Sequence, residues 1–172
     1  VQKLKHYFEM DTAQPSFLII LVDVVSLVNY VLSKIGAENG IAVEIAVQGQ
    51  LEALSTFCTA YSLMHRQNEM ALISCSSQDA RMVYPDCSSV DNVSFVHALH
   101  QISGEVSKGI LESTAEQLLV MGSDQVNGKG SLSQGLSIAL ATSNRRKELQ
   151  SRVVVLQFDR DRNHTYNSVM NC

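Results

Sequence analysis

The sequence predicts an α/β fold: a doubly wound, mostly parallel sheet with one antiparallel hairpin strand at an edge. Residues 17–22 are six consecutive apolar side chains that end at Asp23, which is typical of a strand buried on both faces of a sheet. Residues 152–158 form a second strongly apolar strand. Segments of helical periodicity lie between the strands, as the crossovers of a parallel sheet require.

The other elements follow from local patterns. Residues 70–75 and 80–85 are short strands joined by a turn of polar residues, which predicts a hairpin and an antiparallel third strand. Ser131, with Gln134 three residues later, fits a capping box at a helix start. The expected helices are a short one ending at Gly36, a long one over 42–65, one or two over 95–120, and one over 131–150. If there are two over 95–120, Gly104 and Gly109 are the candidate positions of the break.

The last strand should lie beside the first, because a right-handed crossover returns the chain there. That position would expose a strongly apolar edge, which proteins normally avoid. We therefore expect a single domain over residues 1–172 that is incomplete at its C-terminal side, with further strands or a partner covering this edge.

The composition limits the classes of function. Hydrophobic residues make up 45% of 172 residues, which is enough for a substantial core. The net charge of −4 argues against a general nucleic-acid clamp, although residues 145–162 form a basic edge. The four cysteines are at positions 58, 75, 87 and 172 with no Cys-x-x-Cys, so we expect a reducing compartment and no disulfide framework. The apolar run after residue 17 is too short to span a bilayer.

Three stretches carry a family resemblance. They are residues 15–23, residues 68–85 with their Arg81-x-x-Tyr84-Pro85 ending, and residues 151–155 followed by 166–171. Over about 15–172, the chain resembles the von Willebrand factor A (vWA) domain of the smaller vWA-containing core subunit of TFIIH, the general transcription and nucleotide excision repair factor. The last strands of that domain and the family's zinc-binding module are absent, and residues 28–47 match poorly, which indicates an insertion.

The resemblance implies a non-enzymatic interaction subunit of the nuclear TFIIH core. It would act in RNA polymerase II transcription initiation and nucleotide excision repair by binding the RING-bearing vWA subunit, and through it the rest of the core. It implies no cofactor, no direct specific nucleic-acid binding and no membrane association. Two alternatives stay open: a metal-dependent ligand-binding vWA domain and, with less support, a nucleotide-binding α/β enzyme.

The metal motif of vWA domains is degenerate here. Many vWA domains hold Mg²⁺ with an Asp-x-Ser-x-Ser motif after the first strand, since Mg²⁺ requires oxygen ligands. In this chain the motif begins at Asp23, but Val25 and Leu27 occupy both serine positions. A later threonine position falls near Gly130–Ser131. We expect no metal site, and we expect Asp23 to cap backbone amides at the rim of the sheet.

Two other motifs have weaker functional interpretations. His97-x-x-His100 places two imidazoles on one helix face, but a zinc site needs three or four ligands, so two surface histidines are expected. Gly128-Lys129-Gly130 lacks the third glycine of a dinucleotide-binding loop and the ending of a Walker A motif, so a flexible loop is expected. No catalytic residues are assigned.

The helix expected over 131–150 carries the predicted protein interface. Helical spacing would place Leu132, Leu136 and Leu140 against the sheet. The opposite face combines apolar, small and cationic side chains, a mixture suited to a close protein contact. The predicted interface residues are Ile138, Ala141, Thr142, Arg145 and Leu149.

Overall fold

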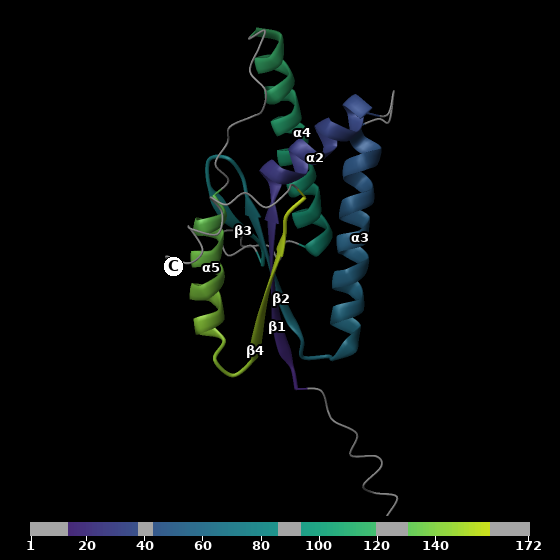
Figure 1. Ribbon diagram of the computed structural model, residues 1–172. Coiled ribbons are helices and arrows are strands. Elements are labelled where there is room, and N and C mark those ends of the chain that lie inside the picture. The colour runs from purple at the N-terminus through teal and green to yellow at the C-terminus, as the bar shows by residue number, and fades with distance from the viewer. Residues whose placement is uncertain (1–13, 38–42, 86–93, 120–130, 159–172) are drawn as a thin grey trace, which may run out of the picture.

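The computed structural model describes residues 14–37, 43–85, 94–119 and 131–158, which form one sheet with helices on both faces (Figure 1). The elements in chain order are β1 (Ser16–Asp23), α2 (Val24–Ala37), α3 (Val43–Met64), β2 (Glu69–Cys75), β3 (Ala80–Tyr84), α4 (Phe95–Leu119), α5 (Leu132–Arg145) and β4 (Gln150–Leu156). The predicted α/β fold with a mostly parallel sheet is confirmed.

The sheet has the order β3-β2-β1-β4. β1 is parallel to β2, with Leu18 opposite Met70, and parallel to β4, with Leu18 opposite Arg152. β3 is antiparallel to β2 and lies at the edge. The predicted hairpin strand and the predicted position of the last strand beside the first are therefore both confirmed.

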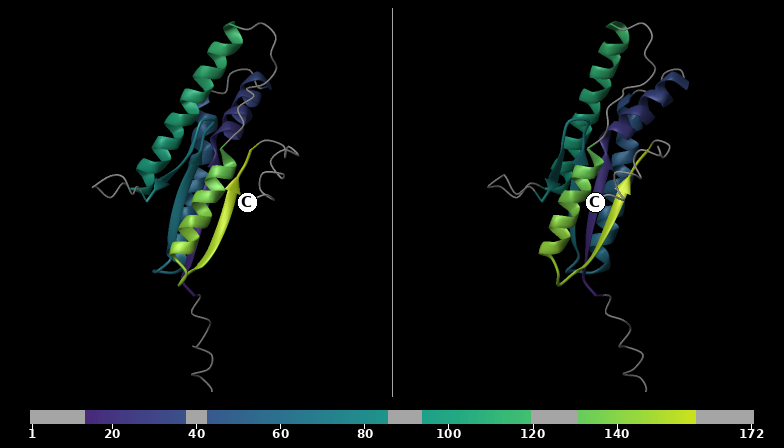
Figure 2. Two further views of the ribbon diagram at one scale, coloured as in Figure 1. Left: turned by 90° about the vertical axis from the view of Figure 1, so that its left-hand side faces the viewer. Right: turned by 60° about the vertical axis from the view of Figure 1, so that its left-hand side comes forward.

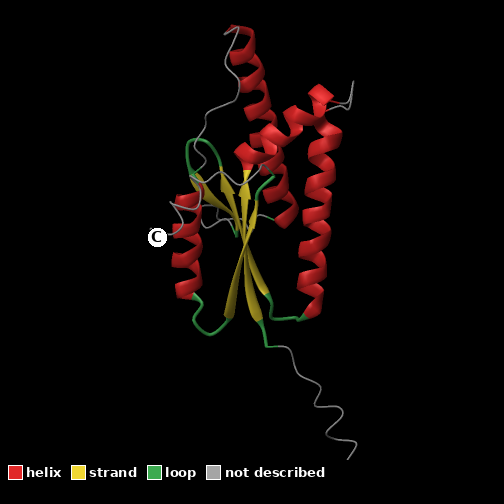
Figure 3. Cartoon of the chain, viewed as in Figure 1, coloured by secondary structure: helices red, strands yellow, loops and turns green. Residues whose placement is uncertain are grey.

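The alternating side chains of β1 supply two separate cores. Leu18, Ile20 and Val22 point to one face and are at most 3% exposed, in a core shared with α2, α3 and α4. On the other face, β1 residues at the intervening positions pack with α5. Figures 2 and 3 show α5 alone on its face of the sheet among the described helices, with the other three on the opposite side. The central strand is therefore buried on both faces, as its composition predicts.

Two details differ from the sequence predictions, and one open alternative is decided. α5 ends at Arg145 rather than near residue 150, because the backbone N–H of Arg146 donates to the carbonyl of Ser143 at 3.0 Å and turns the chain toward β4. Of the two alternatives for residues 95–120, the structure has the single helix: α4 continues through Gly104 and Gly109. The predicted capping box is wrong: Ser131 is the N-cap of α5 but makes no side-chain cap hydrogen bond.

Among the described residues, no helix combines the length and apolar character needed to cross a membrane.

Candidate functional site

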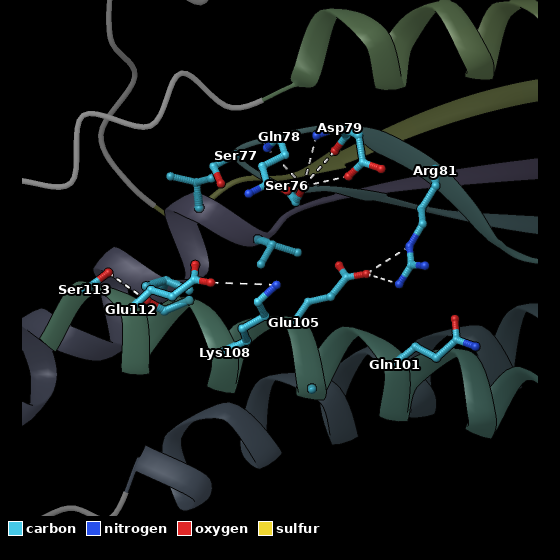
Figure 4. A pocket seen from close by; sticks show the side chains of 15 residues that line it. Ser76, Ser77, Gln78, Asp79, Arg81, Gln101, Glu105, Lys108, Glu112 and Ser113 are labelled. Atoms are coloured by element: carbon cyan, nitrogen blue, oxygen red, sulfur yellow. Dashed lines mark hydrogen bonds and ion pairs between the residues drawn. The ribbon is translucent and has the colours of Figure 1, made fainter. Parts of the chain in front are cut away.

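A cleft of about 840 Å³ opens at the carboxyl ends of β1 and β2 (Figure 4). Its walls are the first turn of α2, the turn between β2 and β3, and one face of α4. In open α/β sheets this is the edge where ligands usually bind. The polar side chains that line the cleft are Ser76, Ser77, Gln78, Asp79, Arg81, Gln101, Glu105, Lys108, Glu112 and Ser113.

Hydrogen bonds hold the turn between β2 and β3 in place. The hydroxyl oxygen of Ser76 accepts from the backbone N–H groups of Gln78 at 3.2 Å and Asp79 at 3.1 Å. Ser131 secures the turn from α5: its backbone N–H donates to the carbonyl of Ser76 at 3.1 Å, and its hydroxyl oxygen lies 2.9 Å from the same carbonyl. The hydroxyl also contacts the carbonyl of Asp79. The Ser131 side chain therefore fixes the cleft wall instead of capping its helix.

Glu105 is the central charged group of the cleft. Arg81 on β3 donates from Nε to Glu105 Oε1 at 3.0 Å, and its Nη2 contacts the same oxygen. The hydroxyl of Ser74, which is only 1% exposed, donates to Glu105 Oε2. No local motif marks Glu105 in the sequence, because its partners Arg81 and Ser74 lie 24 and 31 residues away.

The other charged side chains of the cleft also interact within the protein. The ammonium of Lys108 lies 3.7 Å from the carboxylate of Glu112 one helical turn away. The Ser76 hydroxyl is 2.9 Å from a carboxylate oxygen of Asp79. Most of the charged side chains in the cleft are therefore paired within the protein.

Asp23 caps α2, as predicted. Its Oδ1 accepts from the backbone N–H of Ser26 at 3.2 Å, and the Ser26 hydroxyl donates to the Asp23 carbonyl at 2.9 Å. Ser26 also accepts from the backbone N–H of Phe158 at 3.1 Å, which fixes the end of β4 to this helix start. Asp23 and Ser26 thus stabilise the start of α2, and Ser26 also connects it to the chain just after β4.

The residues at the vWA metal position do not fit a magnesium ion. Leu27 is 1% exposed inside the core, and the Val25 side chain carries no oxygen ligand. Among the described residues, no three His, Cys, Asp or Glu side chains gather as potential metal ligands. We therefore assign no chemistry through a metal at Asp23.

The two described cysteines are poor nucleophiles. Burial raises the pKa of Cys58 to about 11. Burial, with smaller contributions from Asp23 and Glu105, raises the pKa of Cys75 to about 12. Both thiols are free and buried, so they remain protonated at neutral pH and pack as apolar groups.

The weaker motifs receive no support from the structure. His97 and His100 are both exposed on α4. Gly128-Lys129-Gly130 lies outside the described residues, so its expected loop stays a prediction. Four cations of the basic edge, Arg145, Arg146, Lys147 and Arg152, are exposed, while Arg160 and Arg162 lie outside the described residues. Arg146 pairs with Glu69 at 3.2 Å, so part of this edge fixes the start of β2.

The predicted orientation of α5 needs a correction. Leu132, Gly135 and Ala139 are the buried residues of the helix, whereas Leu140, expected to face the sheet, is 50% exposed. Ile138, expected to face outward, packs against the sheet core. The helix is rotated because Gly135 lets the backbone approach β2: a Cβ there would lie 2.4 Å from the Cys75 sulfur.

This rotation divides the five predicted interface residues. Ala141 and Arg145 are exposed and Thr142 is half-buried, so these three border the surface. Ile138 and Leu149 are partly buried and pack against the sheet core, so the prediction that both lie on a solvent-facing surface is wrong. The exposed part of the predicted interface is Ala141 and Arg145.

The fold and the cleft define a vWA-like α/β domain whose metal position is degenerate. The crystal structure of the TFIIH p34 N-terminal domain is similar in fold, with a TM-score of 0.53 at 16% identity, covering 92% of this chain and 73% of that one. The search of curated proteins finds no match.

The family described as Transcription factor Tfb4 matches residues 15–172, and the chain belongs to this family. Tfb4 is the family of the TFIIH p34 subunit. Membership in this family supports a role for the chain in the TFIIH core, in transcription and DNA repair. The subunit of this family is a structural one. It also implies contacts with other components of the TFIIH core.

Proposed function

We propose that this chain is a non-enzymatic subunit of the TFIIH core that acts in the nucleus. It binds the RING-bearing vWA subunit through the outer face of α5, and through it the rest of the core, in transcription initiation and nucleotide excision repair. The observation that carries this proposal is the exposed pair of Ala141 and Arg145, one helical turn apart on α5. A small side chain beside an arginine allows close approach and an anchoring hydrogen bond at the rim.

The test is a pull-down of the recombinant RING-bearing subunit with Ala141→Glu and Arg145→Glu. Both positions are exposed, so the fold should survive. A carboxylate buried without a partner in the contact costs on the order of 2–5 kcal/mol, so each variant should retain little partner. Ser107→Glu on the exposed side of α4 adds the same charge elsewhere and should bind like wild type. Wild-type binding by both α5 variants, with unchanged circular dichroism, would exclude this interface.

We also propose that the domain works without a resident metal or nucleotide. Asp23 contributes a helix cap, and hydrophobic Val25 and Leu27 replace the oxygen ligands. In a crystal soaked in millimolar Mn²⁺, we expect no anomalous peak within bonding distance of Asp23. A strong peak there would instead support the metal-dependent alternative, and a thermal shift with nucleotides would support the enzymatic one.

A further inference from the structure

One face of α3 is apolar and exposed. Six of its residues recur at a spacing of three or four and so share one side of the helix. This outer stripe consists of Ile45, Gly49, Ala53, Phe57, Ala60 and Met64, all of them exposed. Ile45 is 66% exposed, Phe57 49% and Met64 77%. Three large side chains, Ile45, Phe57 and Met64, alternate along the stripe with small residues.

The fold already uses the opposite face of α3. Val47, Leu54 and Cys58 are at most 7% exposed and pack into the core beneath the sheet. The hydroxyl of Tyr61 donates to the carbonyl of Ser16 at 2.7 Å, which fixes the helix to the start of β1. An amphipathic helix normally turns charged residues to water. The outer stripe instead turns apolar residues outward, so the packing among the described residues does not explain its composition.

The charge around the stripe indicates its partner. Residues 43–64 contain two glutamates and no lysine or arginine. Glu52 is exposed beside the stripe and accepts a hydrogen bond from Gln48 at 2.7 Å. An occupant with lysine or arginine along its own apolar face would complement this carboxylate. A second copy of α3 would bring two more glutamates and no cation, so charge disfavours self-pairing.

The outer stripe is too small to hold a partner stably by itself. A 22-residue helix is about 33 Å long, and a helix face is about 10 Å wide. That strip is well below the roughly 800 Å² per partner of a standard stable interface. A helix docked only here would therefore bind weakly. Stable occupancy requires a partner that is also held elsewhere in the same assembly.

We propose that the outer stripe of α3 docks the apolar face of an amphipathic helix from another TFIIH core subunit, one with lysine or arginine beside its apolar residues. Gly49, Ala53 and Ala60 allow the partner helix to approach closely, and Phe57 packs across it. This inference rests on membership in the Tfb4 family and does not depend on the α5 interface.

Photo-crosslinking in the reconstituted core tests the contact. Benzoylphenylalanine replaces Phe57 in one preparation and Ser62, which is exposed on α3 outside the stripe, in a control. We expect the probe at 57 to crosslink to a helix of another subunit, mapped by mass spectrometry, at least tenfold more than the probe at 62. Equal yields, or crosslinks only to a second copy or to another segment of this chain, would overturn the proposal.

Charge variants test the chemistry of the contact. Ala53→Lys places a cation in the stripe, and Glu52→Lys reverses the flanking charge without entering it. Each should reduce the crosslink from position 57 at least tenfold, while Ser62→Lys should not. If the Glu52→Lys variant, which changes an exposed residue and should fold, crosslinks as strongly as wild type, the partner has no cationic side chain beside Glu52.

Ala53→Lys should leave capture of the RING-bearing subunit unchanged. A failure of the α3 proposal can therefore be distinguished from a failure of the α5 interface.

Discussion

Arg81 on β3 donates two hydrogen bonds to one carboxylate oxygen of Glu105 on α4, from Nε at 3.0 Å and from Nη2. The other oxygen of Glu105 accepts from Ser74 on β2. One side chain thus fixes the longest helix to both strands of the hairpin. The Glu105 side chain is only 20% exposed, so water screens its interaction with Arg81 less than it screens an ordinary surface ion pair.

We expect Glu105→Ala to lower the free energy of unfolding by about 1–3 kcal/mol, because the buried Ser74 hydroxyl loses its partner. Chemical denaturation measures the change. Glu112→Ala on the same helix removes only the exposed pair with Lys108 and should change stability by less than about 0.5 kcal/mol. Equal losses in the two variants would mean that the network contributes no more than a surface ion pair.

The contact between Gly135 and Cys75 yields a second prediction. A Cβ at Gly135 would lie 2.4 Å from the Cys75 sulfur and 3.1 Å from Leu21 Cδ2, so α5 must move away from the sheet. Gly135→Ala should therefore destabilise the fold by about 1–3 kcal/mol despite alanine's helix propensity. Gly104→Ala has no heavy atom within 4 Å of the new Cβ and should stabilise α4 by about 0.5–1 kcal/mol.

The double variant Gly135→Ala/Cys75→Ala checks the cause of that loss. Removing the sulfur removes the closest clash, so the double variant should lose less stability than the sum of the two single variants. Additive losses in thermal or chemical unfolding would show that Gly135 matters for a reason other than the approach to Cys75.

The sheet was predictable because its signals are local and strong. The apolar run ending at Asp23 predicts a strand buried on both faces, and the structure confirms β1 at the centre of the sheet. The cap at Asp23 was also predictable, because hydrophobic residues at positions 25 and 27 leave the carboxylate a structural role.

The orientation of α5 and the charged cleft were not predictable in the same way. The leucine spacing favours a helix face through Leu140, but close packing at Gly135 rotates the helix, and a glycine adds nothing to a hydrophobic pattern. Glu105 meets Ser74 and Arg81 only after the sheet and α4 have assembled. A single sequence carries no local sign of such a long-range contact.

The buried thiols of Cys58 and Cys75 predict a pH dependence of stability. Their pKa values are raised to about 11 and about 12, above the ordinary 9.0, so the folded state holds these protons more tightly than the unfolded state. The resulting stabilisation is fully present below about pH 9 and is lost as pH rises toward 11–12. The denaturant concentration at the midpoint of unfolding should therefore decrease as the pH is raised from 9 to 11.

Alkylation measures the same property directly. Treated with iodoacetamide at pH 8, peptides containing Cys58 and Cys75 should stay unmodified in the folded protein and react fully in denaturant. Cys58→Ala should reduce the alkaline loss of stability, since one of the two titrating groups is gone. Rapid labelling of Cys75 in the folded state would contradict its burial beneath α5.

The exposed strand β4 carries the last prediction. Among the described strands it pairs only with β1, and Val153 and Val155 are 41% and 39% exposed. An apolar strand with a free edge is a template for pairing with another chain. We therefore expect the isolated chain to self-associate as its concentration rises, as measured by light scattering.

Replacing Val153 and Val155 with lysine should shift the population toward monomer, because strand pairing would bring like charges together. Leu111→Lys, which changes an exposed residue of α4, should leave the association unchanged. A clean monomer of the wild-type chain at high concentration would show that this edge is protected.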